Sequence, residues 1–183
     1  MNFNIEPANS SDVDALFEIE HAVFVKSDGI ITRRTFLNHI KSRSILLVAK
    51  HGCEENKVVG YILVYVHKVS ARIYSLAVHP DFQCHGAAKT LLKHALDMLE
   101  TSNISTVKLE FRKSNTRVKR LYESFGFKQK MIIEDYYGDH ETAISMNLAI
   151  KRLKCIAAKE SLNALIHQHF LTETYIQNIH LPN

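Results

Sequence analysis

The sequence predicts an α/β fold in which helices pack on a mixed β-sheet. Short apolar runs alternate with stretches whose apolar residues recur every three to four positions, and these two patterns indicate strands and amphipathic helices. Near the middle of the chain, an apolar run at residues 73–78 is followed by a turn and a helix. The expected order is β-α-α-β-β-β-α-β-α-β-β, which is typical of a mixed sheet with helices on it.

The first part of the chain is expected to form an edge strand, a helix and a loop. Residues 3–6 alternate apolar and polar side chains, and Pro7 ends this strand. Ser10 or Ser11 then caps a helix. Its apolar face is formed by Val13, Leu16, Phe17, Ile19, Ala22 and Val23. Residues 25–31 contain Asp-Gly and are expected to form a loop.

A second helix and a β-hairpin come next. Thr32 is the expected cap of the helix. Apolar residues 45–49 and 58–66 are expected to be the two strands of the hairpin. Gly60 lies inside the second strand, where glycine indicates a bulge or a close backbone approach.

The rest of the core continues with the central strand and the helix that begins near Gly86. Helical spacing relates Leu91, Leu92, Ala95, Leu96 and Leu99 in this helix. A strand at residues 106–111 leads to a helix that begins at Asn115 or Thr116 and ends at Gly126. Two last strands are expected at residues 127–136 and 142–148, on either side of a polar turn at 137–141.

Two regions follow from this pattern: a domain over residues 1–149 and a helical extension over residues 150–183. The extension has a broken stripe of apolar residues that indicates one or two amphipathic helices. These helices either pack on their own domain, or form a dimer contact, or partly cover the active site. The sequence leaves these alternatives open, and it leaves open whether the protein is a monomer or a homodimer.

The composition bounds what the chain can be. Its 183 residues and 46% hydrophobic content suit one domain of ordinary size and argue against wholesale disorder. No run approaches the roughly 18 apolar residues of a membrane span, and the N-terminus does not resemble a secretory signal. The three scattered cysteines, Cys53, Cys84 and Cys155, have no metal-ligand spacing, so we expect no metal site and a reducing cytoplasm. The net charge of +4 suits a polyanionic cofactor.

The turn after the central strand has the features of an anion site. It reads Gln83-Cys84-His85-Gly86-Ala87-Ala88-Lys89 and opens a helix. Free N–H groups and the positive end of the helix dipole point at whatever lies over such a turn, and its small residues allow a phosphate to come close. The spacing fits neither a nucleoside-triphosphate P-loop nor a dinucleotide fingerprint. The alternative is that Gly86 and Ala88 only let the helix pack closely on the sheet.

Several stretches of this chain together resemble the GNAT acyl-CoA-dependent N-acetyltransferases. Gln-x-x-Gly-x-Ala matches the family's pyrophosphate motif, [QR]-x-x-G-x-[GA], and the resemblance covers roughly residues 3–149. The member group it looks most like is the ribosomal-protein alanine N-acetyltransferases, through the stretches S-L-A-V-H-P-D-F-Q-C-H-G-A-A-K, L-E-F-R-K-S-N, L-Y-E-S-F-G-F and D-Y-Y. The chain departs from the family at Ala88, where many members have a second glycine, and in its C-terminal extension.

The resemblance implies a binding site for acetyl-CoA. By this resemblance, backbone groups of Leu76, Ala77 and Val78 are expected to line the acetyl and pantetheine arm. The pyrophosphate is expected on the backbone of Gln83, Cys84, His85, Gly86, Ala87, Ala88 and Lys89, with the charge of Lys89 nearby. Asn115 is expected to hydrogen-bond the pantetheine arm, although an ordinary helix cap explains it equally well.

The resemblance also implies an acid and a base. Glu110 matches the position of the base in N-terminal acetyltransferases of this type and is expected to act through a water. Tyr122 matches the family's general acid, near the coenzyme sulfur. The alternatives are that Glu110 is a solvated strand residue and that Tyr122 is a core aromatic whose hydroxyl is satisfied locally.

The acceptor side of the site is implied less directly. By resemblance, the loop at residues 25–31 and the Tyr136-Tyr137 turn flank an acceptor peptide, and Phe24 is placed at the floor of its slot. Adjacent tyrosines at a strand end are also common in sheets that bind nothing.

The sequence thus predicts direct transfer of an acetyl group from acetyl-CoA to an amine, foremost the α-amine at a protein N-terminus. The alternatives are the same chemistry on a lysine side chain, a polyamine or another small amine, or a non-catalytic acyl-CoA-binding module. Nucleic acid is not an expected partner, although the basic residues Arg112, Lys113, Arg117, Lys119 and Arg120 leave that role open.

Overall fold

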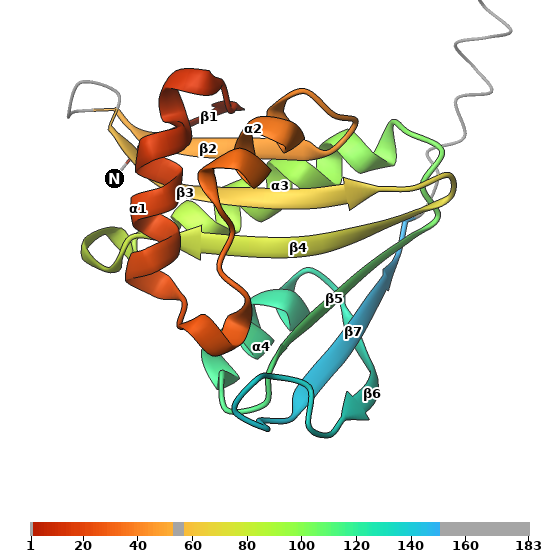
Figure 1. Cartoon of the computed structure of the whole chain (residues 1–183). Helices are drawn as coiled ribbons and strands as arrows, with labels where there is room; N and C mark the ends of the chain where they lie inside the picture. Colours follow the sequence, from red (N-terminus) through yellow and green to blue (C-terminus); the bar gives the residue numbers. More distant parts are fainter. Residues whose placement is uncertain (1, 53–56, 151–183) are drawn as a thin grey trace, which may run out of the picture. The chain divides into compact units, whose positions relative to one another are not determined.

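The computed structural model describes residues 2–52 and 57–150 (Figure 1). Within them, one sheet has the strand order β1-β2-β3-β4-β5-β7-β6. The strands are β1 (Phe3–Pro7), β2 (Ile45–His51), β3 (Val58–Val66), β4 (Ser70–Val78), β5 (Thr106–Arg112), β6 (Lys128–Ile133) and β7 (Ala143–Ala149). The α-helices are α1 (Val13–Val23), α2 (Arg33–Ile40), α3 (Ala87–Glu100) and α4 (Thr116–Ser124). The predicted mixed α/β fold and its order of elements are confirmed.

The sheet opens between β4 and β5. These two strands are parallel, and their pairing covers only Ser70–Arg72 against Thr106–Lys108. Beyond that point β5 stays paired with β7 through Arg112, whereas β4 stays paired with β3 through Val78. The two strands therefore diverge (Figure 1), and their facing backbone edges are not paired with each other beyond this point; we call this unpaired stretch the opening.

Helices cover both faces of the sheet. Helices α1 and α2 pack on one face over a core that includes Leu16, Phe36, Val48, Tyr61, Leu63 and Ala77. Helices α3 and α4 pack on the other face over a larger core that includes Ile73, Leu91, Leu92, Leu109, Phe111, Tyr122 and Met146. Because residues of a strand alternate between faces, neighbouring side chains on β5 belong to opposite sides of the molecule.

Polar side chains begin the N-terminal helices. Thr32 accepts from Thr35 N at 3.2 Å, which confirms the predicted cap of α2. The first helix begins differently from the prediction, because Asn9 and not a serine caps the short turn that leads into it, and the residue directly before α1 is Asp12, which makes no side-chain cap bond. Asn9 Oδ1 accepts from Ser11 N at 2.9 Å, and a short 3₁₀ turn at Ser10–Asp12 precedes the α-helix. Asparagine is as good a cap as serine, and it stands one residue earlier in the chain.

Gly60 has the close backbone approach that its position predicts. A β-carbon at this residue would lie 2.8 Å from the carbonyl oxygen of Ala77 on β4. The neighbouring pairing with β2 also shifts register between Ala49 and Lys50, beside Gly60. Any larger residue at position 60 would therefore push β3 away from the end of β4.

Strand β6 is shorter than the predicted span of residues 127–136. It ends at Ile133, and Asp135 then adopts a φ of 55°, which strand geometry excludes. The backbone N–H groups of Tyr136 and Tyr137 both donate to the carbonyl oxygen of Glu141 at 3.2 Å. These bonds turn the chain before β7 begins, so both tyrosines lie in the connecting turn.

The described part of the chain ends at Ile150. Its side chain is buried, and its N–H donates to the carbonyl oxygen of Ser105 at 3.0 Å. The predicted helices of the C-terminal extension lie outside the described residues, so the boundary between the two regions stays a prediction. Within the described residues, no helix is both long enough and apolar enough to cross a membrane.

Candidate active site

The turn between β4 and α3 leaves backbone donors available, as its sequence predicts. The helix's first backbone bond runs from Thr90 N to the carbonyl oxygen of Gly86 at 3.0 Å. The N–H groups just before Thr90 therefore have no acceptor inside the helix. Among the described residues no side chain caps this end of α3. A negatively charged group over the turn would complete these donors and meet the positive end of the helix dipole.

The shape of this turn depends on two left-handed residues. Cys84 has a φ of 67° and Gly86 has a φ of 93°. A β-carbon added at Gly86 would meet nothing within 4 Å, so the space above the turn is open. The side chain of Gln83 links the turn to the end of β4, because its amide donates to the carbonyl oxygen of Val78 at 3.0 Å. The open space argues against the alternative that Gly86 serves only close packing of helix on sheet.

Arg117 is a further residue at this turn that the sequence did not single out for the cofactor. Its Nη2 lies 2.9 Å from the sulfur of Cys84. Lys89 and His85 are exposed in the same segment. The side chain of Arg117 comes from the first turn of α4, so α3 and α4 both contribute to a positively charged rim around the available N–H groups.

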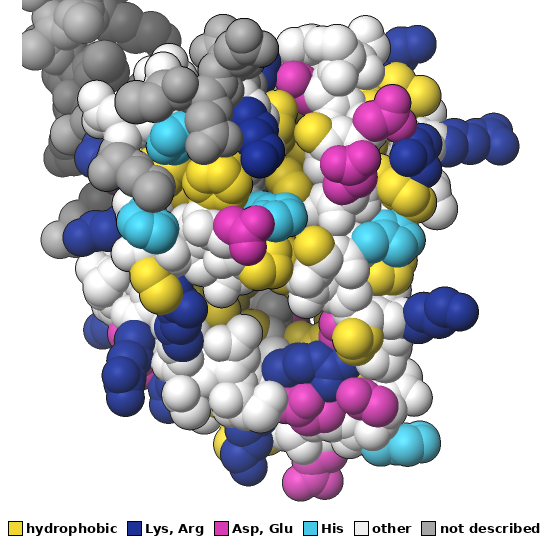
Figure 2. Space-filling view, turned by 90° about the vertical axis from the view of Figure 1, so that its left-hand side faces the viewer, with side chains coloured by type: hydrophobic (Ala, Val, Ile, Leu, Met, Phe, Trp, Pro, Cys, Tyr) yellow, Lys and Arg dark blue, Asp and Glu magenta, His cyan; other side chains and the backbone are white. Residues whose placement is uncertain are grey.

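The predicted pantetheine residues lie where the sheet opens. Leu76, Ala77 and Val78 end β4, beyond the last residues that pair with β5. Figure 2 looks onto the side where β4 ends and shows a hollow in this surface, with acidic side chains gathered beside a basic one below it. Asn115 is the cap of α4 and accepts from Val118 N at 3.1 Å, which confirms the structural alternative for this residue. Its side-chain amide nitrogen also remains a potential donor to a ligand.

Glu110 lies on β5 and is half-buried. Its Oε2 accepts from Nε of Arg72 at 2.8 Å, and Ser145 Oγ donates to its Oε1 at 3.4 Å. The neighbouring residues Leu109 and Phe111 belong to the core on the other face. Glu110 is therefore neither a freely solvated strand residue nor a carboxylate surrounded by apolar groups.

Tyr122 is buried in the larger core. Its ring packs between Phe111, at a centroid distance of 5.9 Å, and Phe127, at 5.5 Å. Burial raises the pKa of the Tyr122 phenol, and the nearby Tyr137 adds to this shift. The phenol therefore stays protonated at neutral pH, which is the state that a proton donor needs.

Glu110 and Tyr122, the predicted base and acid, thus lie on opposite faces of β5. Glu110 is on the face covered by α1 and α2, whereas Tyr122 packs on the α3 and α4 face. Beyond Arg72 and Lys108 the backbones of β4 and β5 are not paired with each other. Glu110 lies on this stretch of β5, and Tyr122 packs against Phe111 on the same stretch.

The structure brings the predicted acceptor tyrosines to this end of β5. The hydroxyl of Tyr136 accepts from Nη2 of Arg72 at 2.8 Å, and the same arginine binds Glu110. The ring of Tyr137 lies under the guanidinium of Arg112, 4.2 Å from it. Phe24 directly follows α1 and packs at the edge of the smaller core.

The sequence model described as the Acetyltransferase (GNAT) family matches residues 13–127 of this chain. The chain belongs to the GNAT family. It is therefore an acetyl-CoA-dependent N-acetyltransferase, as the resemblance of its sequence stretches implies.

Relatives and solved structures agree with this assignment. A ribosomal protein bS18-alanine N-acetyltransferase of Haemophilus ducreyi is 34% identical over 148 residues, covering 79% of this chain and 98% of the relative. The enzyme of the same name from Salmonella typhimurium is 38% identical over 99 residues, covering 52% of this chain and 67% of the relative. The crystal structure of the ribosomal-protein-S18-alanine N-acetyltransferase from Escherichia coli has a TM-score of 0.74, with 28% identity over 85% of this chain and 98% of that one.

Two polar clusters beside this GNAT site were not predicted from the sequence. The first surrounds Arg112, which the sequence presented as part of a basic run. The second is buried: Glu20, 2% exposed, accepts from the hydroxyl of Tyr61 and from Ile31 N at 2.9 Å. Burial raises the pKa of Glu20. The only signal in the sequence for this buried cluster was the position of Glu20, a charged residue within the otherwise apolar stripe of the first helix.

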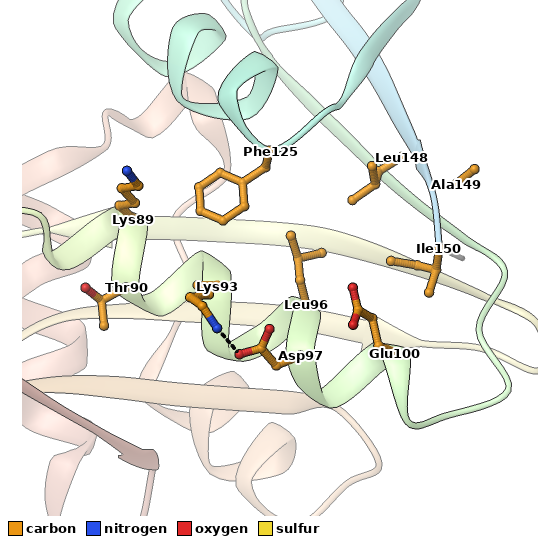
Figure 3. Close-up of a pocket in the computed structure, with 10 residues that line it drawn as sticks. All are labelled: Lys89, Thr90, Lys93, Leu96, Asp97, Glu100, Phe125, Leu148, Ala149 and Ile150. Atoms are coloured by element: carbon orange, nitrogen blue, oxygen red, sulfur yellow. Dashed lines mark hydrogen bonds and ion pairs between the residues drawn. The ribbon is translucent and has the colours of Figure 1, made fainter. Parts of the chain in front are cut away.

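A groove of about 620 Å³ runs along α3 (Figure 3). It is lined by Lys89, Thr90, Lys93, Leu96, Asp97, Glu100, Phe125, Leu148, Ala149 and Ile150. Of the predicted GNAT site, only Lys89 borders it, so it is not the place of the reaction. Within the described residues no cluster of three or more histidine, cysteine, aspartate or glutamate side chains is arranged to hold a metal ion.

Proposed function

We propose that this GNAT enzyme transfers the acetyl group of acetyl-CoA to the α-amine at the N-terminus of a protein, and that a ribosomal protein of the bS18 type is its acceptor. The observation that carries the proposal is the placement of Glu110 and Tyr122 on opposite faces of β5, at the opening beside β4. The names of the relatives supply the acceptor class.

The proposed reaction moves protons off the nitrogen and onto the sulfur. Glu110 accepts a proton from the ammonium form of the acceptor through a water, and the free amine then attacks the thioester carbonyl. As the carbon–sulfur bond breaks, the new amide nitrogen loses its second proton to solvent, and Tyr122 donates its proton to the leaving sulfur and is reprotonated from solvent. Each acid or base contribution of this kind is worth about 10²–10⁴ in rate.

The cofactor residues divide between backbone and side chain in this proposal. Available N–H groups from Gly86 to Lys89 bind the pyrophosphate, with Arg117 and Lys89 beside them. The free edge of β4 at Leu76–Val78 binds the pantetheine arm, together with the amide of Asn115. The scattered cysteines support a cytoplasmic location for the reaction.

A mass-spectrometric screen tests the acceptor. A peptide with the bS18 N-terminus is offered with acetyl-CoA, next to the same peptide with a blocked N-terminus and an added lysine, and next to polyamines. Acetylation of the free N-terminal peptide alone supports the proposal. Preference for the lysine or the polyamine would assign the side-chain or small-amine alternative, and binding of acetyl-CoA without any transfer would indicate a non-catalytic module.

The ion pairs of Arg112 disfavour a nucleic-acid role. Its side chain is only 19% exposed and is bonded to three carboxylates, so it is not free to contact phosphates. Arg112 therefore cannot be counted among the basic residues that would contact a nucleic acid.

A further inference from the structure

Arg112 stands beside the proposed base. It is the last residue of β5, two positions after Glu110, so both side chains leave the strand on the same face. Its side chain is 19% exposed. A charge buried to this degree needs partners, because removing it from water is costly unless it is paired and hydrogen-bonded.

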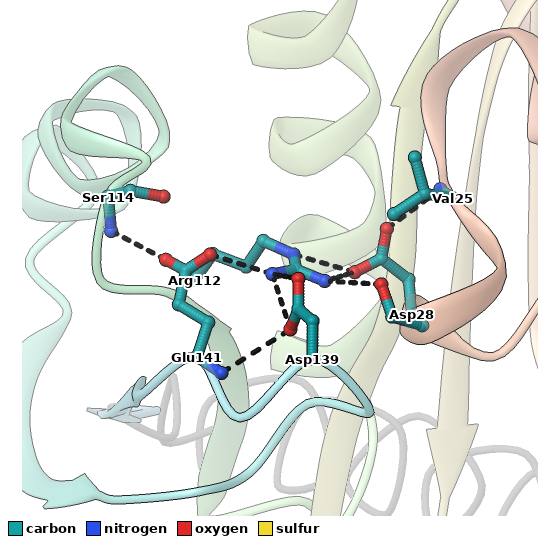
Figure 4. Close-up of polar contacts among 7 residues, drawn as sticks. Val25, Asp28, Arg112, Ser114, Asp139 and Glu141 are labelled. Carbon is teal, nitrogen blue, oxygen red and sulfur yellow. Dashed lines mark hydrogen bonds and ion pairs between the residues drawn. The ribbon is translucent and has the colours of Figure 1, made fainter.

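The first set of partners comes from the connection between α1 and α2. Nε of Arg112 donates to Asp28 Oδ1 at 2.7 Å, and Nη2 donates to Ser27 Oγ at 3.0 Å. The second oxygen of Asp28 accepts from Val25 N at 2.9 Å (Figure 4). Arg112 thereby holds the segment at residues 25–31, which is the predicted acceptor loop.

The second set of partners comes from the turn between β6 and β7. Nη1 of Arg112 donates to Glu141 Oε2 at 2.7 Å and to Asp139 Oδ2 at 2.8 Å. Glu141 also accepts from Ser114 N at 3.0 Å, just before the cap of α4 (Figure 4). The guanidinium also stacks over Tyr137. The same side chain therefore holds the second predicted acceptor segment.

The two segments also touch each other directly. Gly138 N donates to the carbonyl oxygen of Ser27 at 3.1 Å. A β-carbon placed on Gly138 would lie 3.5 Å from the β-carbon of Ser27. The two segments are thus in close contact, and Arg112 forms hydrogen bonds with both of them.

The electrostatics favour the closed arrangement. Burial opposes the charge on Arg112, but its bonds to Glu141, Asp139 and Asp28 outweigh this and raise its pKa. Hydrogen bonding by Arg112 in turn lowers the pKa of Asp139, and bonds from Ser114 and Arg112 lower that of Glu141. Arg112, Asp139 and Glu141 are consequently charged at neutral pH, when the enzyme has to hold its acceptor.

We propose that Arg112 is a positioning residue that holds the 25–31 and 134–142 segments together over Glu110, so that an acceptor amine is presented at the opening between β4 and β5. The inference rests on the proposed acetyl transfer but not on the identity of the amine. Arg112 then contributes to binding of the acceptor and not to binding of acetyl-CoA.

Steady-state kinetics with the acceptor found in the screen test this role. Arg112→Ala should raise the acceptor KM by about tenfold or more while kcat and the KM for acetyl-CoA stay within about threefold, which is the signature of lost acceptor binding. Arg112→Lys keeps one charge and should be intermediate, because lysine cannot make the forked contacts. Arg33→Ala, which removes an exposed ion pair with Asp14, is the matched control. Unchanged acceptor KM in Arg112→Ala would overturn the proposal.

A cross-link separates closure of the segments from simple loss of charge. Disulfides need β-carbons about 3.8 Å apart, and positions 27 and 138 meet this need. In the Arg112→Ala background, the oxidised Ser27→Cys/Gly138→Cys pair should restore the acceptor KM, and reduction should abolish the rescue. Oxidised Arg112→Ala without the pair is the control for the native cysteines. No rescue in a protein shown to be cross-linked would refute positioning by closure.

Hydrogen exchange without any acceptor keeps the test independent of the proposed function. Arg112→Ala should exchange faster than wild type over residues 25–31 and 134–142, and Arg33→Ala should not. If the screen finds no acetylated amine, the proposed function fails, but this measurement still shows whether Arg112 holds the two segments together. Equal exchange rates in wild type and Arg112→Ala over both segments would exclude that role of Arg112.

Discussion

At the scale of the residue, Glu110 is the group whose removal is most informative. Glu110→Gln keeps the size of the side chain and a hydrogen bond to Arg72, but it cannot accept a proton. We expect kcat/KM to fall by about 10²-fold or more near neutral pH, and to recover partly as the pH approaches the pKa of the acceptor amine. A pH–rate profile of the variant and of wild type measures this. Full activity at every pH would remove Glu110 from the mechanism.

Glu20 gives a prediction about stability. Its folded-state pKa lies above the ordinary value of 4.5, first because of burial. A carboxyl group with a raised folded pKa favours folding while it is protonated, and this contribution is lost as the pH rises from 4.5 through the folded pKa. Glu20→Gln has no such loss. Its free energy of unfolding relative to wild type should therefore improve as the pH rises above 4.5, and then level off.

Thermal or urea unfolding from pH 4.5 to 8 measures this difference between Glu20→Gln and wild type. Glu18→Gln removes an exposed carboxylate from the same helix and is the control. A stability difference for Glu20→Gln that does not change with pH would contradict the assigned shift of the Glu20 pKa.

The site residues could be predicted where a sequence motif contains them, but their hydrogen-bond partners could not. Glu110, Tyr122 and Asn115 follow from the resemblance of L-E-F-R-K-S-N and L-Y-E-S-F-G-F to the family. Their contacts are made by residues far away in the chain: Arg72 is 38 positions from Glu110, and Asp28 is 84 positions from Arg112. Such pairs depend on strand order and loop closure, which local sequence patterns do not contain.

At the scale of the element, the start of α3 makes the sharpest prediction. Gly86→Glu places a carboxylate in the open space over the available N–H groups, where the helix dipole attracts it. It should therefore compete with the pyrophosphate of acetyl-CoA. We expect calorimetry to show a loss of acetyl-CoA affinity of about tenfold or more, since a loss of about 1.4 kcal/mol is tenfold.

Gly86→Ala is the matched control for this variant. Both substitutions strain the φ of 93°, by about 1–2 kcal/mol for a left-handed residue, but only glutamate adds a charge. Their melting temperatures should be lowered alike, while the affinity of Gly86→Ala for acetyl-CoA should stay nearer to wild type. Unaltered acetyl-CoA binding in a folded Gly86→Glu protein would show that the turn does not bind the pyrophosphate.

Elements were predictable to the extent that their ends are set locally. Thr32 and Asn115 begin helices through their own side chains, so the caps were readable. The end of β6 was not, because the bonds to Glu141 that turn the chain at Tyr136 and Tyr137 come from the far side of the turn. The sequence prediction therefore ran this strand on to Tyr136, up to the polar turn at residues 137–141.

At the scale of the whole molecule, the proposed function depends on the divergence of β4 and β5. Periodicity predicted both strands but not that their pairing stops after Arg72 and Lys108. Beyond that point β5 keeps its pairing with β7 and β4 keeps its pairing with β3. The separation of the two strands is thus a property of the assembled sheet.

This arrangement predicts the kinetic order of the reaction. In the proposed mechanism an acceptor on the α1 and α2 side and acetyl-CoA on the α3 and α4 side do not exclude each other, so both should be bound when the acetyl group moves. Double-reciprocal plots at several fixed concentrations of the second substrate should therefore intersect. Parallel lines would indicate an acetylated enzyme intermediate and contradict direct transfer.

A cysteine variant completes this test. Cys84 is an exposed thiol in the described part of the chain, and its sulfur contacts Arg117 in the phosphate turn. Thiolates are the usual nucleophiles of covalent acyl transfer. Because we propose that this turn binds the pyrophosphate and not the thioester, Cys84→Ser should keep its kcat within about threefold of wild type, as expected for a residue outside the chemical step. A collapse of kcat with unchanged acetyl-CoA affinity would instead indicate that the sulfur takes part in the transfer.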